Sequence, residues 1–276
     1  MNCHLIKPEA CEKTLAGFFY AEQMKHRIRN HIEQDETILT LLCEKQYCPA
    51  AESAVKQFRI RLKNHIKKYP VFETTHKPCH TPVNIDPDIR RMYETCAKVD
   101  VGPMASVAGM ISEITLNAAR KAGASEVIAD NGGDIALFVK TTAVIGIYAG
   151  SALNCNLAFQ IESTPRPLGI CTSSGTVGHS FSYGCADAAI VISENIPLAD
   201  AAATALCNHI QNPADLNRCF QFLDRLPEIQ GAMVILGEQI ALWGILPELV
   251  EARVEPDLIT KGWNYYMESM HVKNIR

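Results

Sequence analysis

Two oxygen-bearing side chains, Asp200 and Thr204, stand four residues apart in the alanine-rich run 198–206. If this run is helical, they share one face of the helix, because residues four apart are neighbours there. A carboxylate and a hydroxyl are hard oxygen ligands of the kind that Mg²⁺ prefers. The alternative is that Asp200 lies in the first turn of the helix, where the helix dipole favours an acid.

Three further polar or glycine-rich segments interrupt the apolar middle of the chain. Residues 101–109 read as a loop that enters a helix, and free N–H groups at such an entry favour an anion such as a phosphate. Residues 131–134, Asn-Gly-Gly-Asp, fit a tight hairpin in which the glycines take positive φ. These segments also have plainer interpretations, namely close helix packing for the first and an ordinary turn for the second.

The third segment, residues 171–180, follows a strand and brings together hydroxyls, glycines and His179. Such a loop can hold phosphates through its N–H groups, although it lacks the order of a P-loop. We interpret His179 as a candidate acid or base. The alternative is a histidine that is only hydrogen-bonded locally.

The elements that must position these residues follow from hydrophobic periodicity and turn residues. We predict strands at 27–33, 37–43, 126–129, 135–139, 144–148, 158–161, 168–172, 188–192, 232–236 and 239–243. We predict helices at 49–69, 87–99, 104–122, 197–209 and 214–225, with an irregular segment at 70–87 that holds His76, Cys79 and His80. Strands and helices mix without strict alternation, so we expect an α+β fold with a largely antiparallel sheet.

The composition excludes several classes of protein. Of 276 residues 47% are hydrophobic and 20% are charged, which is typical of a globular chain. No apolar run reaches the roughly 18 residues of a membrane span, and the net charge of −4 lacks the basic signature of a nucleic-acid binder. The N-terminus has no apolar signal sequence, so we expect a cytoplasmic protein whose 11 scattered cysteines are reduced thiols.

The order of the four segments resembles the ApbE superfamily of FAD-dependent flavin transferases, and is closest to its short, cytoplasmic, uncharacterised ApbE-like branch. The resemblance covers roughly residues 25–245, which leaves 1–24 and 246–276 as terminal extensions. It implies antiparallel sheets flanked by helices. Two departures stand out: Ala108-Gly109 replaces the Lys-Gly pair of the transferases, and their Asp-Pro-Arg-Thr-Gly segment is missing after the loop that ends near His179.

The resemblance also implies roles for single residues. Asp200 and Thr204 match the pair that helps to bind the magnesium of the FAD pyrophosphate, and His179 takes the place of a family histidine. The residues that match the flavin-nucleotide pocket, or its entrance in the first segment, are Gly102, Met104, Asn131, Gly132, Gly133, Asp134, Thr172, Ser173, Ser174, Gly175 and Thr176.

Two classes of function remain open at this stage. One is a magnesium-assisted transferase or hydrolase that acts on a flavin or dinucleotide phosphate, with His179 as acid or base and the N–H groups near Ser174 and Gly175 holding negative charge. The other is a non-catalytic accessory or binding protein of anaerobic redox or sulfur metabolism, in which Cys171 and Cys185 are the thiols of interest. In both, we expect a small-molecule ligand, no nucleic-acid or membrane partner, and a homodimer as the default assembly.

Overall fold

A computed structural model of the chain describes residues 4–6, 27–34, 36–149, 157–176 and 182–252. Its centre is a nine-stranded sheet with the order β1-β11-β10-β9-β8-β5-β4-β3-β2, and a separate three-stranded sheet has the order β12-β7-β6. Neighbouring strands in both sheets run antiparallel, as the sequence predicts. The strands are β1 (His4–Ile6), β2 (Arg27–Gln34), β3 (Thr37–Glu44), β4 (Val127–Asn131), β5 (Asp134–Phe138), β6 (Ala143–Gly146), β7 (Leu157–Ile161), β8 (Leu168–Ser173), β9 (Ala188–Ser193), β10 (Ile229–Leu236), β11 (Gln239–Gly244) and β12 (Glu248–Glu251).

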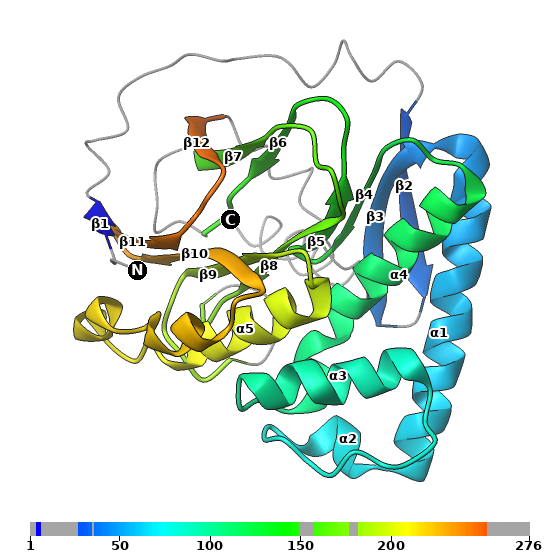
Figure 1. The fold of residues 1–276 in the computed structure, drawn as a ribbon, viewed down its shortest axis with the longest axis horizontal. Helices are drawn as coiled ribbons and strands as arrows, with labels where there is room; N and C mark the ends of the chain where they lie inside the picture. Colours follow the sequence, from blue (N-terminus) through cyan, green and yellow to red (C-terminus); the bar gives the residue numbers. More distant parts are fainter. Residues whose placement is uncertain (1–3, 7–26, 35, 150–156, 177–181, 253–276) are drawn as a thin grey trace, which may run out of the picture.

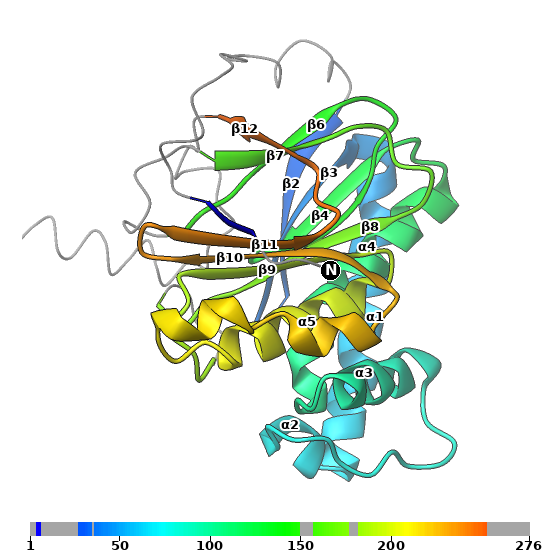
Figure 2. The ribbon, with the colours of Figure 1, turned by 60° about the vertical axis from the view of Figure 1, so that its left-hand side comes forward.

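Helices cover one face of the large sheet, and the three-stranded sheet lies over the other (Figures 1 and 2). The described helices are α1 (Cys48–Lys68), α2 (Val71–Thr74), α3 (Pro87–Lys98), α4 (Val107–Ala122) and α5 (Ile196–Asn208), with 3-10 turns η2 (Lys45–Tyr47), η3 (Pro103–Ser106), η4 (Pro213–Asn217) and η5 (Gln221–Arg225). No described helix is long and apolar enough to cross a membrane.

Local sequence signals explain where the helices begin and end. Asp86 caps α3 by accepting hydrogen bonds from the N–H groups of Asp88 and Ile89, and Pro87 follows in the first turn. Helix α4 ends at Gly123, which takes the left-handed conformation with φ 119°. The predicted helix boundaries at 87 and 122 therefore agree with the structure.

The segment 214–225 is not an α-helix, so that prediction is wrong. It forms the two 3-10 turns η4 and η5, with hydrogen bonds of the i→i+3 kind such as Leu223 N–H to Phe220 O. Asn212 and Asp215 form a capping box at the start of η4. Leu216, Phe220 and Leu223 are buried at spacings that an α-helix would also give, which explains the error.

Two short strands lie in the segments that the sequence assigns to the extensions. Strand β1 pairs with β11 at one edge of the large sheet, and β12 pairs with β7 in the small sheet. The opposite edge of the large sheet is β2. The sequence predicts neither of these two strands, although it does predict the four-residue strand β6.

The two faces of the large sheet carry two separate apolar cores. In β5 the side chain of Ala136 belongs to the core under the helices, whereas Ile135 and Leu137 belong to the core under the small sheet. Because side chains alternate along a strand, Asp134 shares the helix-facing side with Ala136. This alternation directs the acid at the end of the hairpin toward α4 and α5.

Candidate functional site

Asp200 lies at the crossing of α4 and α5. The backbone N–H of Gly109 donates a 2.7 Å hydrogen bond to Asp200 Oδ2, and the aspartate is only 7% exposed. A Cβ at position 109 would lie 2.8 Å from Asp200 Cβ and 3.0 Å from Ile196 O. Only glycine lets α4 come close enough for its N–H to hold this carboxylate.

Asp134 is the second buried acid of the site, and we call Asp134 and Asp200 the acid pair. Asp134 is 6% exposed, and its Oδ1 has no hydrogen-bond partner within the described structure. Burial, followed by the charges of Asp200 and Asp130, raises the pKa of Asp134 well above its usual range. Its backbone carbonyl is fixed by a 2.7 Å hydrogen bond from the Ser112 hydroxyl.

Burial raises the pKa of both carboxyls of the acid pair. Burial raises the pKa of Asp200 to about 7, although the N–H groups of Gly109 and Ala108 and a hydrogen bond with Asp134 lower it. The pKa of Asp134 is raised as well, so burial disfavours the charged form of both carboxyls. The site thus concentrates acceptor oxygens in a place where their charge is poorly compensated.

The hairpin that carries Asp134 is tied to the start of α4. Gly132 and Gly133 have φ of 69° and 102°, as a tight two-residue turn requires, and Gly133 N–H donates to Asp130 Oδ1. Asn131 Nδ2 donates to the carbonyl of Ala108 at 3.3 Å. The structure therefore brings the 131–134 segment and the 101–109 segment together around Asp200.

Residues 173–176, the Ser-Gly loop, leave β8 beside this hairpin. Ser173 is buried, and a Cβ at position 133 would lie 3.8 Å from Thr172 Cβ. Gly175 N–H donates to the Ala186 carbonyl and Thr176 N–H donates to Ser174 Oγ. In this conformation the N–H of Gly175 already has an acceptor, and the expectation that N–H groups near Ser174 and Gly175 hold negative charge stays a prediction.

Thr204 and the remaining predicted residues have varied settings. Thr204 lies on α5 one turn after Asp200 and is half-buried. Met104, in η3, is half-buried and packs against the core, and a Cβ at Gly102 would meet Thr75 O at 1.9 Å. Close packing is thus a sufficient reason for glycine at 102. His179 lies outside the described residues.

The thiol beside the acid pair is not a reactive one. Cys171 is fully buried, and its Sγ faces the carbonyl of Ile196 at 3.7 Å. Burial and then the charges of Asp134 and Asp200 raise its pKa well above the usual range of a thiol. Of the two thiols of interest, Cys171 therefore has the setting of a core residue, whereas Cys185 is half-buried.

The sequence does not predict the contacts that join the helices around the acid pair. Gly109 falls within the predicted helix 104–122, but neither its bond to Asp200 nor the ion pair of Arg91 with Glu113 follows from the sequence. Arg91 donates to both oxygens of Glu113, at 2.6 and 3.2 Å, and to Asn195 Oδ1 at 3.4 Å, which joins α3, α4 and the start of α5. A glycine inside an apolar helix was the one available signal for a close helix crossing.

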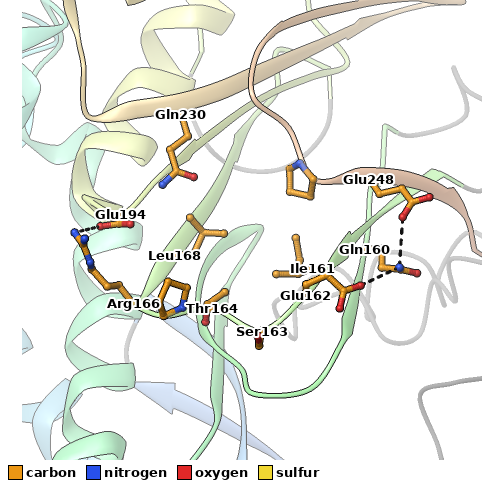
Figure 3. Close-up of a pocket in the computed structure, with 12 residues that line it drawn as sticks. Gln160, Ile161, Glu162, Ser163, Thr164, Arg166, Leu168, Glu194, Gln230 and Glu248 are labelled. Carbon is orange, nitrogen blue, oxygen red and sulfur yellow. Dashed lines mark hydrogen bonds and ion pairs between the residues drawn. The ribbon is translucent and has the colours of Figure 1, made fainter.

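An open cavity lies elsewhere in the molecule. Its volume is about 380 Å³, and Figure 3 shows its lining residues from the β7–β8 connection and the segment before β12. Arg166 pairs with Glu194 at 2.8 Å, and Gln160 donates to Glu162 and Glu248. Every charged side chain that lines it has a partner, and none of the predicted site residues lines it. The two side chains of the acid pair are instead buried, 6% and 7% exposed.

Comparisons with known proteins fit this arrangement. A family model described as "AbpE bacteria" matches residues 21–220. A UPF0280 protein from Methanothrix thermoacetophila is 44% identical over 237 residues, which covers 85% of this chain and 100% of the relative. A UPF0280 protein from Methanocella arvoryzae is 42% identical over 244 residues, covering 88% of this chain and 97% of the relative.

A solved structure shows the same fold. The apo form of the flavinyl transferase ApbE from Pseudomonas stutzeri matches with a TM-score of 0.54 at 10% identity, covering 79% of this chain and 95% of that chain. At this identity the match supports a shared fold and not a shared function. The expected α+β fold of antiparallel sheets flanked by helices is confirmed.

Proposed function

Because this chain belongs to the ApbE-like family that includes the UPF0280 proteins, we propose that it binds a flavin or dinucleotide phosphate together with Mg²⁺ at the acid pair. Flavin transferases share its fold, and a flavin nucleotide is the ligand class that this likeness supports. The proposal concerns binding first, and turnover is tested separately.

The observation that carries the proposal is the buried Oδ1 of Asp134, which has no hydrogen-bond partner among the described residues and belongs to a side chain 6% exposed. A buried acceptor without a donor costs free energy on the order of 1–3 kcal/mol, so such an atom points to a missing partner. A cation is one partner that two neighbouring carboxylates can both bind. The described residues include no group of three His, Cys, Asp or Glu side chains that could hold a metal, so the remaining ligands would be the hydroxyl of Thr204 and oxygens of the bound phosphate.

Neighbouring residues fix the positions of both acids. Gly109 N–H orients Asp200, and Ser112 fixes the backbone of Asp134, so both carboxylates are placed before a ligand arrives. A bound Mg²⁺ would neutralise the negative charge of a pyrophosphate and polarise its P–O bonds. Because burial raises both pKa values, a cation bound here would favour the charged forms of the two carboxylates. We retain His179 as the proposed acid or base, and Cys171 takes no part.

A thermal-shift titration tests binding, with FAD, FMN and ADP, each with and without Mg²⁺. Ligand at about 100 times its dissociation constant stabilises the folded state by about 2.7 kcal/mol, which raises Tm by roughly 5–10 °C. We expect this shift for the wild type with Mg²⁺ and its loss in Asp200→Asn, which keeps an oxygen for the Gly109 N–H. Glu238→Gln, which removes a charge on the exposed β10–β11 turn, is the matched control.

Absence of any shift in the wild type would contradict the proposal. Release of AMP or FMN from FAD, with and without an acceptor protein, then separates an enzyme from an accessory binding protein. The cytoplasmic location and the homodimer stay predictions from the sequence.

A further inference from the structure

Asp187, the residue before β9, joins two segments that meet only in the folded chain. Its Oδ1 accepts a 2.8 Å hydrogen bond from the hydroxyl of Thr176, the last residue of the Ser-Gly loop. Its Oδ2 accepts a 2.7 Å hydrogen bond from the backbone N–H of Gly237, in the turn between β10 and β11. We call these two hydrogen bonds the Asp187 clamp.

The backbone that carries Asp187 is anchored in the large sheet. The N–H of Asp187 donates to the carbonyl of Ile235 in β10 at 2.9 Å, and the next residue, Ala188, pairs with Ile235 in the β9–β10 ladder. Every residue of β9 is buried. The clamp therefore ties the Ser-Gly loop to a rigid part of the fold.

The Ser-Gly loop takes its shape from the segment around Asp187. The N–H of Gly175 donates to the carbonyl of Ala186 at 2.9 Å, and a Cβ at position 175 would lie 1.8 Å from Gly184 O. Beyond β8 the described part of the loop belongs to neither a helix nor a strand. Its conformation therefore depends on these contacts and on the clamp at its end.

The same loop adjoins the acid pair through β8. Strand β8 pairs with β5, and burial raises the pKa of Asp134 while a hydrogen bond from the backbone of Thr172 lowers it in part. The loop begins at the next residue, Ser173. At no more than about 3.6 Å per residue, Thr176 lies within roughly 14 Å of Thr172. A dinucleotide whose phosphates lie at the acid pair can therefore reach the loop.

We propose that Asp187 is a positioning residue of the nucleotide site, which holds the Ser-Gly loop in one conformation for contact with a ligand bound at the acid pair. This role rests on the proposed function and adds a residue that does not itself touch the ligand. A loop that is already ordered costs a ligand less conformational entropy on binding. Loss of the clamp should therefore weaken binding although the acid pair is intact.

Isothermal titration of FAD with Mg²⁺ tests this role in the wild type, Asp187→Ala and Asp187→Asn. We expect Asp187→Ala to bind FAD about tenfold more weakly, because the ligand must then order the loop. Asp187→Asn should bind like the wild type. Its amide oxygen can accept from Gly237 N–H, and its amide nitrogen can donate to the Thr176 hydroxyl, which rotates to accept. Glu238→Gln, at an exposed position beside Gly237, is the matched control.

Hydrogen exchange in the ligand-free protein measures the clamp directly. Thr176→Val removes one of its two hydrogen bonds from an exposed side chain, so this variant serves as the second test if Asp187→Ala folds poorly. In both variants the amides of residues 173–176 should exchange about tenfold faster than in the wild type. The amides of β9 should exchange at the wild-type rate.

The outcomes separate this role from the proposed function. A wild type that does not bind FAD overturns the proposed function, and the positioning role with it. A wild type that binds FAD overturns only the positioning role if Asp187→Ala binds equally well, or if Asp187→Asn binds as weakly as Asp187→Ala. Faster exchange throughout the protein, including β9, would show that Asp187 supports the whole fold and would also contradict the positioning role.

Discussion

The N–H of Gly109 and the carboxylate of Asp200 join α4 to α5 through one buried hydrogen bond of 2.7 Å. The bond exists because position 109 has no side chain, and it places the acid where Asp134 lies as its neighbour. The same two residues therefore determine both how α4 packs against α5 and where the buried carboxylate lies.

Gly109→Ala should destabilise the protein. The added methyl group would meet Asp200 Cβ at 2.8 Å and Ile196 O at 3.0 Å, and such overpacking costs about 1–3 kcal/mol, more than the roughly 1 kcal/mol that alanine gains in helix propensity. Urea unfolding measures the loss. Lys121→Ala, at an exposed position of α4, is the control and should change stability by less than about 0.5 kcal/mol.

Asp200→Asn should gain stability relative to the wild type as the pH rises, in metal-free buffer. The pKa of Asp200 is about 7 in the folded state and near 3.8 when unfolded, so between these values the folded state binds more protons and loses stability with increasing pH. Asparagine does not titrate, so the difference should grow by at most about 1.4 kcal/mol per pH unit and level off above pH 7. Urea unfolding at several pH values measures it, and a difference independent of pH would contradict the assignment.

His65 should make the fold less stable in mild acid. It is buried, accepts or donates one hydrogen bond with the Tyr93 hydroxyl at 2.9 Å, and has a lowered pKa because burial and then Lys68 disfavour its charged form. The unfolded chain binds the extra proton first, so stability falls as the pH drops below about 6.5, the ordinary value. His65→Gln should remove this part of the pH dependence while lowering stability at neutral pH. If the stability of His65→Gln falls in mild acid as steeply as that of the wild type, another group causes the pH dependence.

Buried thiols should resist alkylation in the folded protein. Burial raises the pKa of Cys43 and of Cys96 to about 12, and Cys43 also contacts Cys48 with 3.7 Å between the sulfur atoms. Since the thiolate is the reactive form, iodoacetamide at mildly alkaline pH should modify Cys185 well before these residues. Peptide mass spectrometry before and after unfolding measures the order. Equal labelling of Cys43 and Cys185 would show that the core opens readily.

Much of the fold could be predicted because its signals are local. Val55, Phe58 and Leu62 mark the buried face of α1 at helical spacing, and the two glycines of the hairpin mark the turn between β4 and β5. The α-helix predicted at 214–225 is wrong because successive 3-10 turns bury apolar residues at intervals that an α-helix also gives. Capping by Asn212 and Asp215, rather than apolar spacing, decided the structure there.

The site could be predicted only in part, for a related reason. The shared helix face of Asp200 and Thr204 follows from their spacing alone. The contact of Asp200 with Gly109 and Asp134 depends on how distant elements cross, and no local pattern encodes it. The N–H of Gly175 likewise donates to the carbonyl of Ala186, a residue outside the loop. This contact depends on how the chain folds back, so the local sequence does not predict it.

The strand order of the large sheet has a consequence for biosynthesis. Strand β1 completes the edge beside β11, although nearly the whole chain separates them, and β2 lies at the opposite edge. At about 5–20 residues per second, a ribosome needs on the order of ten seconds or more between making β1 and making its partner. Until then β1 has no partner strand, so this edge of the sheet forms last on the nascent chain.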